Sequence, residues 1–182
     1  MSALTDMSPG RGRTQRRIGP LLLAGLGLAF FLLGAGWLAV DRFVIGRGNA
    51  ALPTSLAGLV RSDQMTGRAA LAEIEHLHGK GFPLVDGAVA RYGGGTASVW
   101  VSSTWAPLLA ERQVKAMTER IAEGRSPFTP AGSRQVGDTT VYVLTGMGQV
   151  HYYFQLDRRV IWLAASPSLA EQGMEELVRA LQ

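Results

Sequence analysis

The segment Ala88-Val-Ala-Arg-Tyr-Gly-Gly-Gly-Thr-Ala-Ser-Val-Trp-Val-Ser102 places two runs of strand-forming residues on either side of three glycines. Valine, tyrosine and tryptophan favour β-strands, and a glycine-rich connection lets the chain reverse direction within a few residues. The segment therefore predicts a β-hairpin with strands at 88–92 and 97–102. Strands joined by so short a turn run antiparallel, which argues against an all-parallel, doubly wound sheet.

An amphipathic helix is predicted directly after this hairpin. Ser103 or Thr104 supplies a cap, Pro107 is tolerated in the first turn, and Gly124 marks the end. The apolar positions of this helix recur at helical spacing on one stripe. They are Ala110, Val114, Met117 and Ile121.

The rest of the chain predicts two more helices and three more strands. A first helix extends from the cap Thr66 to Gly79, with Ala70, Ile74 and Leu77 on its apolar side. After a breaker at 126–130 and a turn at 136–138, β-branched and aromatic residues predict strands at 140–144, 151–156 and 160–164. The last helix opens at Ser166-Pro167, and its buried positions are Ala170, Met174, Leu177 and Leu181.

Two of these units resemble each other. Val99-Trp100-Val101 precedes one apolar stripe and Ile161-Trp162-Leu163 precedes another, 60 to 62 residues later. An internal duplication is one interpretation, and chance similarity between two ordinary strand-to-helix units is the other. The predicted fold class is α+β, a small antiparallel sheet with about three helices packed on one face.

An uncharged apolar run, residues 18–40, precedes this domain. As a helix it would be about 35 Å long, enough to cross a bilayer core of about 30 Å. Four arginines precede it, whereas Asp41 and Arg42 offset each other after it, so the N-terminus is predicted to be cytoplasmic. The expected organisation is a basic tail (1–17), a transmembrane anchor (18–40), a linker (41–51) and an extracytoplasmic domain (52–182). A cleavable signal peptide or a twin-arginine signal is the alternative, but the run is too long for the first, and Ile18-Gly-Pro does not fit the second.

Charge and composition exclude several classes of protein. The net charge is +4, but after Gly46 there are 13 Lys and Arg against 12 Asp and Glu, which leaves no basic footprint for nucleic acid. The absence of cysteine excludes disulfides, thiolate nucleophiles and cysteine-ligated metals. Abundant Ala, Gly and Arg, with one Asn and two Lys, is typical of a GC-rich bacterium. The inner (plasma) membrane is the expected location.

The first predicted helix carries a candidate metal site. Glu75 and His78 are three residues apart, as are Glu73 and His76, so each pair lies on one helix face. Carboxylate and imidazole groups ligate several metals, but a di-iron centre would need a second such motif. The alternative is a solvated polar face opposite the apolar stripe, with His78 near the carbonyl end of the helix, where the dipole favours a cation.

A candidate partner or ligand surface lies on one predicted strand. His151, Tyr153 and Gln155 alternate with Tyr152, Phe154 and Leu156, so the period of two puts the first three on one sheet face. Trp100 or Trp162 beside them would complete an aromatic platform suited to a partner protein or an apolar ligand. The alternative is cross-strand pairing that only stabilises the sheet.

No familiar catalytic motif is present: no phosphate loop, no His-Glu-x-x-His, no Gly-x-Ser-x-Gly and no Gly-x-Gly-x-x-Gly after a strand. We therefore expect a non-enzymatic, membrane-anchored subunit or accessory protein of an envelope complex, without a cofactor. A ligand- or metal-binding module outside the membrane is the alternative. An enzyme would require several of His151, Tyr153, Glu75 and Asp86 to converge in one pocket.

Overall fold

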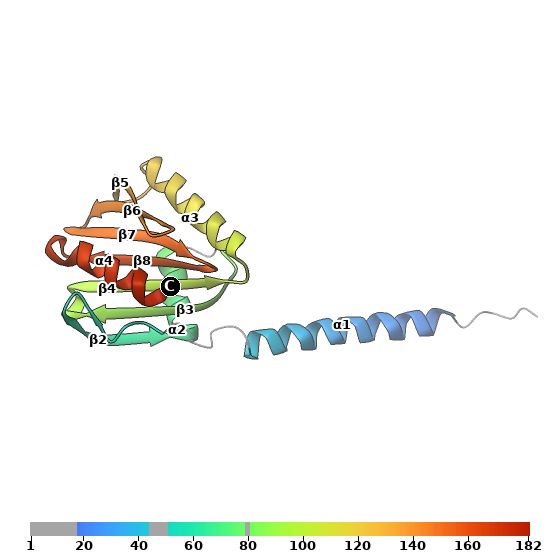
Figure 1. Ribbon diagram of the computed structural model, residues 1–182. Helices are drawn as coiled ribbons and strands as arrows, with labels where there is room; N and C mark the ends of the chain where they lie inside the picture. The colour runs from blue at the N-terminus through green and yellow to red at the C-terminus, as the bar shows by residue number, and fades with distance from the viewer. Residues whose placement is uncertain (1–17, 44–50, 79–80) are drawn as a thin grey trace, which may run out of the picture. The chain divides into compact units, whose positions relative to one another are not determined.

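The computed structural model describes residues 18–43, 51–78 and 81–182, with side chains for 22–40, 51–76 and 81–182 (Figure 1). The chain divides into two compact units, residues 1–41 and 42–182. The predicted basic tail and most of the predicted linker fall outside the described residues. The two units are described separately below.

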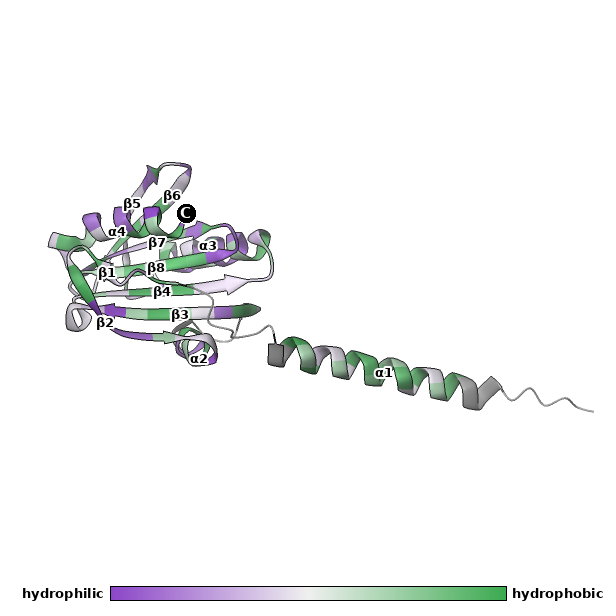
Figure 2. Ribbon diagram, turned by 60° about the horizontal axis from the view of Figure 1, so that its bottom comes forward, coloured by the Kyte–Doolittle hydropathy of each residue, from purple (hydrophilic) through white to green (hydrophobic). Residues whose placement is uncertain are grey.

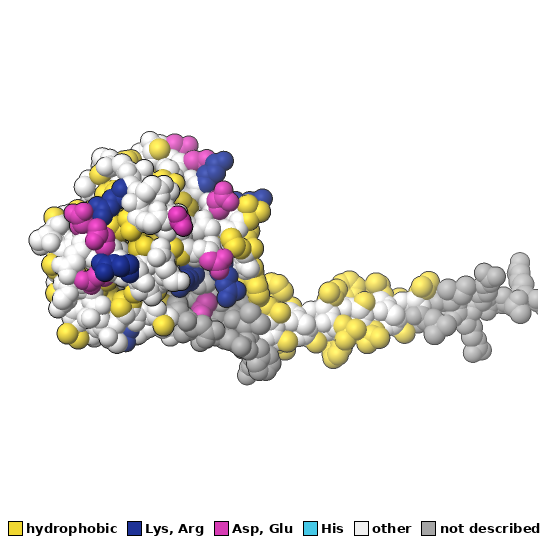
Figure 3. Space-filling view, in the orientation of Figure 1, with side chains coloured by type: hydrophobic (Ala, Val, Ile, Leu, Met, Phe, Trp, Pro, Cys, Tyr) yellow, Lys and Arg dark blue, Asp and Glu magenta, His cyan; other side chains and the backbone are white. Residues whose placement is uncertain are grey.

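In its described residues the first unit consists of the helix α1 (Ile18–Phe43), which extends two residues past the boundary of the unit. Its segment Leu22–Val40 is long and apolar enough to span a membrane, and none of it is buried. Figure 3 shows hydrophobic side chains and no charged ones along the described part of this helix, and the ribbon in Figure 2 has hydrophobic colours along it. Phe31 is 70% exposed and Trp37 is 72% exposed. The prediction of a charge-free apolar helix near the N-terminus is confirmed.

The second unit is one eight-stranded antiparallel sheet with helices. Its strand order is β1-β2-β3-β4-β8-β7-β6-β5, so the two hairpins β3–β4 and β7–β8 meet at the centre. A mixed α+β fold with an antiparallel sheet is thus confirmed. The strands are β1 (Ser55–Leu56), β2 (Leu59–Thr66), β3 (Leu84–Tyr92), β4 (Ala97–Thr104), β5 (Thr129–Val136), β6 (Thr139–Gly146), β7 (Gln149–Leu156) and β8 (Arg159–Ala165), and the helices are α2 (Gly67–His78), α3 (Pro107–Ala122) and α4 (Pro167–Leu181).

The helices do not share one face of the sheet, so that part of the predicted architecture is wrong. Phe154 and Ile161 pack in the core under α4, whereas their strand neighbours Tyr153 and Val160 pack under α3. Val89 packs with α2 on the α3 side. Figure 1 shows α4 in front of the sheet and α2 behind it. Successive residues of β7 and β8 are apolar on both faces, and burying both requires helices on both sides.

The α4 face holds the largest core. Met174 and Leu177 of α4 are fully buried against Val99, Phe154 and Leu163 of the sheet. Figure 2 shows hydrophobic segments in the middle of β3, β4 and β8, where the sheet is covered. The apolar positions predicted for the last helix, which include Met174 and Leu177, pack in this core and hold α4 on the sheet.

Three strands, β1, β2 and β5, were not predicted from the sequence, and β2 and β5 are the two long ones. β2 carries polar residues in its second half, with Ser62, Asp63 and Gln64 all exposed. β5 begins inside the predicted breaker and has a register shift between Pro130 and Gly132. Both lie towards the edges of the sheet, where one face and one edge meet solvent, so neither needs an apolar pattern.

The predicted duplication is only partly reflected in the fold. β4 and β8 pair with Trp100 directly opposite Trp162, so the two tryptophan-bearing strands meet at equivalent positions. The helices that follow them pack on opposite faces. The duplication therefore stays a prediction for the two hairpins and does not extend to the placement of their helices.

Candidate functional site

A row of paired side chains crosses β3, β4, β8, β7 and β6 on the face under α2 and α3. Val89 pairs with Trp100, Trp100 with Trp162, Trp162 with Tyr153, and Tyr153 with Tyr142. Directly opposed residues in antiparallel strands project to the same face. We call Trp100, Trp162, Tyr153 and Tyr142 the aromatic ladder.

The outer three rings of the ladder stack in sequence. The ring centroids of Tyr153 and Trp162 are 5.6 Å apart at 16°, and those of Tyr142 and Tyr153 are 4.8 Å apart at 14°. Tyr153 is only 2% exposed, and its hydroxyl lies 2.9 Å from Oγ1 of Thr118 on α3. Burial is the main cause of the raised pKa of Tyr153. The centre of the ladder is therefore core.

His151 lies beside the ladder as a buried, neutral side chain. The indole Nε1 of Trp162 can only donate, and it lies 3.2 Å from Nδ1 of His151. Nε2 must then carry the imidazole proton, which it donates to the carbonyl of Gly146 at 3.1 Å. The Phe128 ring lies 4.6 Å from the imidazole. Burial lowers the pKa of His151. This histidine is therefore arranged as part of the folded structure.

The two ends of the predicted surface are also tied into the fold. Trp100 donates from Nε1 to the Glu73 carboxylate at 3.3 Å, and the same oxygen accepts from Arg91 at 3.2 Å. Gln155 donates to the carbonyl of Pro107 at 3.0 Å, which connects β7 to the start of α3.

The structure thus brings Trp100, His151, Tyr153, Gln155 and Trp162 onto one face, as the period of two predicts. That face is not an open platform, because α2 and α3 cover it and His151 and Tyr153 are buried. Trp100, Trp162 and Gln155 stay partly exposed. A role in binding remains a prediction for these three.

The predicted metal residues are both in α2. Glu75 is half-buried, His76 is exposed, and the side chain of His78 lies outside the described residues. Within the described part of the chain, no three His, Asp or Glu side chains come close enough together to hold a metal ion. The Glu75 and His78 pair stays a prediction, because the His78 side chain lies outside the described residues.

Asp86 and His151, two of the four residues named for an enzyme, do not converge. Asp86 pairs with Ser103 on β4, whereas His151 pairs with Ala164, which pairs with Ser98 on that same strand. Positions 98 and 103 on one strand are about 17 Å apart. Asp86 and His151 are therefore at different levels of the sheet, without a shared pocket.

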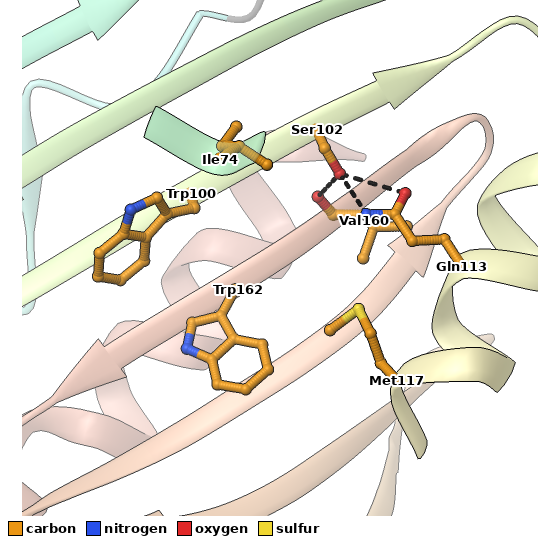
Figure 4. A pocket seen from close by; sticks show the side chains of 7 residues that line it. All are labelled: Ile74, Trp100, Ser102, Gln113, Met117, Val160 and Trp162. Carbon is orange, nitrogen blue, oxygen red and sulfur yellow. Dashed lines mark hydrogen bonds between the residues drawn. The ribbon is translucent and has the colours of Figure 1, made fainter. Parts of the chain in front are cut away.

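A small cavity separates α2 from α3 over the ladder (Figure 4). Its volume is about 10 Å³, which is about the space of one water molecule. Figure 4 shows Trp100 and Trp162 side by side on one wall and Ser102 hydrogen-bonded to Gln113 on the other. An organic ligand would not fit without displacing a helix.

A much larger recess lies on the other side of α3. It has a volume of about 700 Å³ and is an open groove. One wall is the side of α3 and the other is formed by the β5–β6 and β7–β8 turns, with Tyr142 from the outer end of the ladder. We call it the α3 groove; its acidic residues are Glu111, Glu119, Asp138 and Asp157.

Sequence reasoning did not find the α3 groove. Glu111 and Glu119 are on one helix, but Asp138 and Asp157 belong to separate turns. Only the long-range pairing of β4 with β8 brings these turns alongside α3, the helix that follows β4. The one sequence signal was the eight-residue spacing of the two glutamates, which places them on similar faces of the helix.

Comparison of the chain with protein-family models, curated proteins and solved structures gives no match. A functional proposal therefore depends on the geometry of this chain itself.

Proposed function

We propose that this chain is a non-enzymatic accessory protein or subunit of an envelope complex, anchored in the plasma membrane by α1. Its N-terminus lies in the cytoplasm and its α+β unit binds another envelope protein outside. The observation that carries this proposal is the segment Leu22–Val40 of α1, which has no charged residue and is not buried, in a chain whose residues 42–182 form a separate compact unit. Exposure of such an apolar surface to water is unfavourable, whereas the hydrocarbon core of a bilayer can cover it.

The α+β unit supports a binding role over a catalytic one. Its aromatic face is filled by α2 and α3, and the cavity left there is about 10 Å³. Its large recess is an open groove on the surface and not an enclosed pocket that excludes water. Enclosure and convergent polar groups favour catalysis, whereas open grooves suit the side chains of another protein.

Co-purification from the native membrane tests this proposal. The full chain is extracted in mild detergent and bound proteins are identified by mass spectrometry, with an anchor-only chain of residues 1–50 as control. We expect a stoichiometric partner with the full chain that is absent from the control. A full chain without any partner, or a partner retained equally by residues 1–50, would contradict the proposal.

A further inference from the structure

We infer that one end of the sheet lies against the membrane that holds α1, through an apolar rim made of Phe82, Pro83, Trp105, Pro107 and Leu108. The inference rests on the proposed function, because it requires the anchor. The surface that the rim contacts is the boundary between the headgroups and the acyl chains of the bilayer. The β3–β4 and β6–β7 turns, at the opposite end of the sheet, then lie farthest from the membrane.

Two connections that leave the sheet side by side form the rim. Leu84 begins β3 and pairs with Thr104, the last residue of β4. Phe82 and Pro83 therefore come directly before one strand, where residues 105–108 continue from its antiparallel neighbour. In Figure 1 this is the end of β4 that leads into α3. The five apolar residues are thus gathered at one end of the sheet.

The rim exposes apolar side chains to solvent. Trp105 is 47% exposed and Leu108 is 55% exposed. They are two of the four large hydrophobic side chains that are exposed in the described part of the α+β unit; the other two, Val60 and Met147, lie apart at the opposite end. The two prolines of the rim are also exposed, and its phenylalanine is half-buried. A gathering of exposed apolar residues marks a contact surface.

Trp105 differs from the other two tryptophans of the α+β unit. The indole of Trp100 donates to Glu73, and that of Trp162 donates to His151. The indole N–H of Trp105 has no hydrogen-bond partner among the described residues. Proteins place tryptophan at membrane–water interfaces, where the ring meets lipid and the N–H meets water. Trp105 is suited to that position.

The tether keeps the unit close to the bilayer. Residues 41–50 separate the apolar segment Leu22–Val40 from Ala51, where the described α+β fold begins. A segment of this length spans at most about 35 Å. A unit of this size has a radius of gyration of about 14 Å and is about 36 Å across, so it stays within about one diameter of the membrane. Contacts within a tethered system act at an effective concentration on the order of 1 mM, so a few apolar side chains are enough.

The chain also enters the unit from the rim end. β1 pairs antiparallel with β2, and β2 pairs antiparallel with β3, so β1 runs in the same direction as β3, away from the rim. The amide of Arg61 donates to the carbonyl of Thr54 at 2.9 Å, so this pairing begins one residue before β1. The chain that approaches β1 therefore comes from the side of the sheet where the rim lies.

The shape of the rim favours a lipid surface over a protein partner. None of its five residues lines the small cavity or the α3 groove, so the rim protrudes from the end of the sheet without a recess of its own. Protein interfaces require a matching shape at their core, whereas a bilayer adapts to a protruding apolar loop.

Charged side chains of both signs flank the rim. Glu111 and Arg112 follow Leu108 by three and four residues on α3, and both are exposed. Asp157 and Arg158 are exposed beside the end of β4, where the amide of Thr104 donates to the carbonyl of Arg158. These charges offset each other, so the contact with the bilayer is apolar and we expect it to be insensitive to salt.

The test uses the full chain in phosphatidylcholine liposomes, with the fluorophore NBD on a single introduced cysteine, since the chain has none of its own. Leu108→Cys places the label on the rim, and Met147→Cys places it on an apolar residue that is 78% exposed at the opposite end. Lipid that carries a spin label near its headgroup quenches NBD on contact. We expect quenching at position 108 to exceed that at position 147 at least about threefold, also at high salt. Equal quenching at the two positions, or quenching at 108 that salt abolishes, would overturn the inference.

Two variants of the chain labelled at position 108 test the role of the rim itself. Trp105→Ser removes the largest rim side chain, and we expect quenching at position 108 to fall at least about twofold. Val60→Ser is the matched control, because Val60 is a 73% exposed apolar residue far from the rim, and quenching should stay within about 20%. Equal quenching in the two variants would overturn the inference.

Two further observations separate this inference from its alternatives. NBD at position 108 with apolar, blue-shifted emission but without quenching by the labelled lipid would mean that a second copy of the chain covers the rim, and would overturn the inference. Flotation of the liposomes reports the anchor. A chain that floats without quenching at position 108 overturns the inference while the proposed anchor stands, whereas a chain that does not float contradicts both.

Discussion

The buried pair of Ser102 and Gln113 offers a stability test of the region between α2 and α3. Ser102 is 4% exposed, Gln113 is 3% exposed, and Nε2 of Gln113 donates to Oγ of Ser102 at 3.1 Å. Ser102→Ala leaves a buried amide without its partner, which costs about 1–3 kcal/mol of unfolding free energy. Gln113→Met leaves the Ser102 hydroxyl with the Val160 carbonyl at 3.5 Å as an acceptor, and costs about 1 kcal/mol.

The double variant Ser102→Ala/Gln113→Met is expected to lie within about 1 kcal/mol of the wild type. Both polar groups are then removed together, and a methionine of similar length fills the same space beside the cavity of about 10 Å³. The single losses add to about 2–4 kcal/mol, so the coupling energy between the two sites is at least about 1 kcal/mol. This value would show that the pair is a self-contained structural contact.

The assay is equilibrium urea unfolding of the full chain in detergent micelles. Trp100 and Trp162 line the same cavity, so their fluorescence reports this region, and far-UV circular dichroism provides the second probe. Gln172→Met, an exposed glutamine on α4, serves as control and is expected to change stability by less than about 0.5 kcal/mol. Additive losses in the double variant, with an unchanged m-value, would refute the reasoning.

Three further predictions concern the core, the pH response and the membrane topology. Leu177→Ala empties a fully buried site under α4 and should lower the unfolding free energy by about 2–5 kcal/mol in the same urea assay, whereas Leu108→Ala, 55% exposed in the wild type, should change it little. Burial lowers the pKa of His151 below 6.5, so its neutral form stabilises the fold above pH 6.5 and this contribution is lost as the pH falls through the folded pKa. Urea midpoints measured from pH 7.5 to 5 should therefore fall more steeply for the wild type than for His151→Gln, and parallel curves would contradict this assignment. The chain has no cysteine, so an impermeant maleimide should label Ser133→Cys but not Ser2→Cys in right-side-out vesicles; the reverse pattern would place the α+β unit in the cytoplasm.

Local pattern was sufficient to predict most of the helices and strands. The triple glycine at 93–95 and the apolar stripes of α3 and α4 report directly on backbone freedom and on one buried face. The edge strand β5 escaped prediction because it contains Pro130 and Gly132 and has little side-chain burial. Edge strands take their hydrogen bonds from one neighbour only, so their sequences are weakly constrained.

The sequence also predicted that Trp100, His151, Tyr153, Gln155 and Trp162 share one sheet face, because side chains alternate strictly along a strand. It could not predict that helices cover that face. Burial of His151 and Tyr153 depends on where α3 returns after β4, and that position is set by contacts between residues far apart in the chain.

By itself, therefore, the sequence determined an apolar N-terminal helix, an antiparallel α+β fold and the membership of one aromatic row, since each follows from the composition or period of a continuous segment. Only the tertiary structure decided the placement of helices on both faces of the sheet, the burial of the ladder and the assembly of the α3 groove. The groove joins one helix to two turns through the pairing of β4 with β8. Long-range strand pairing depends on the whole core, and no local pattern encodes which distant turns it brings together.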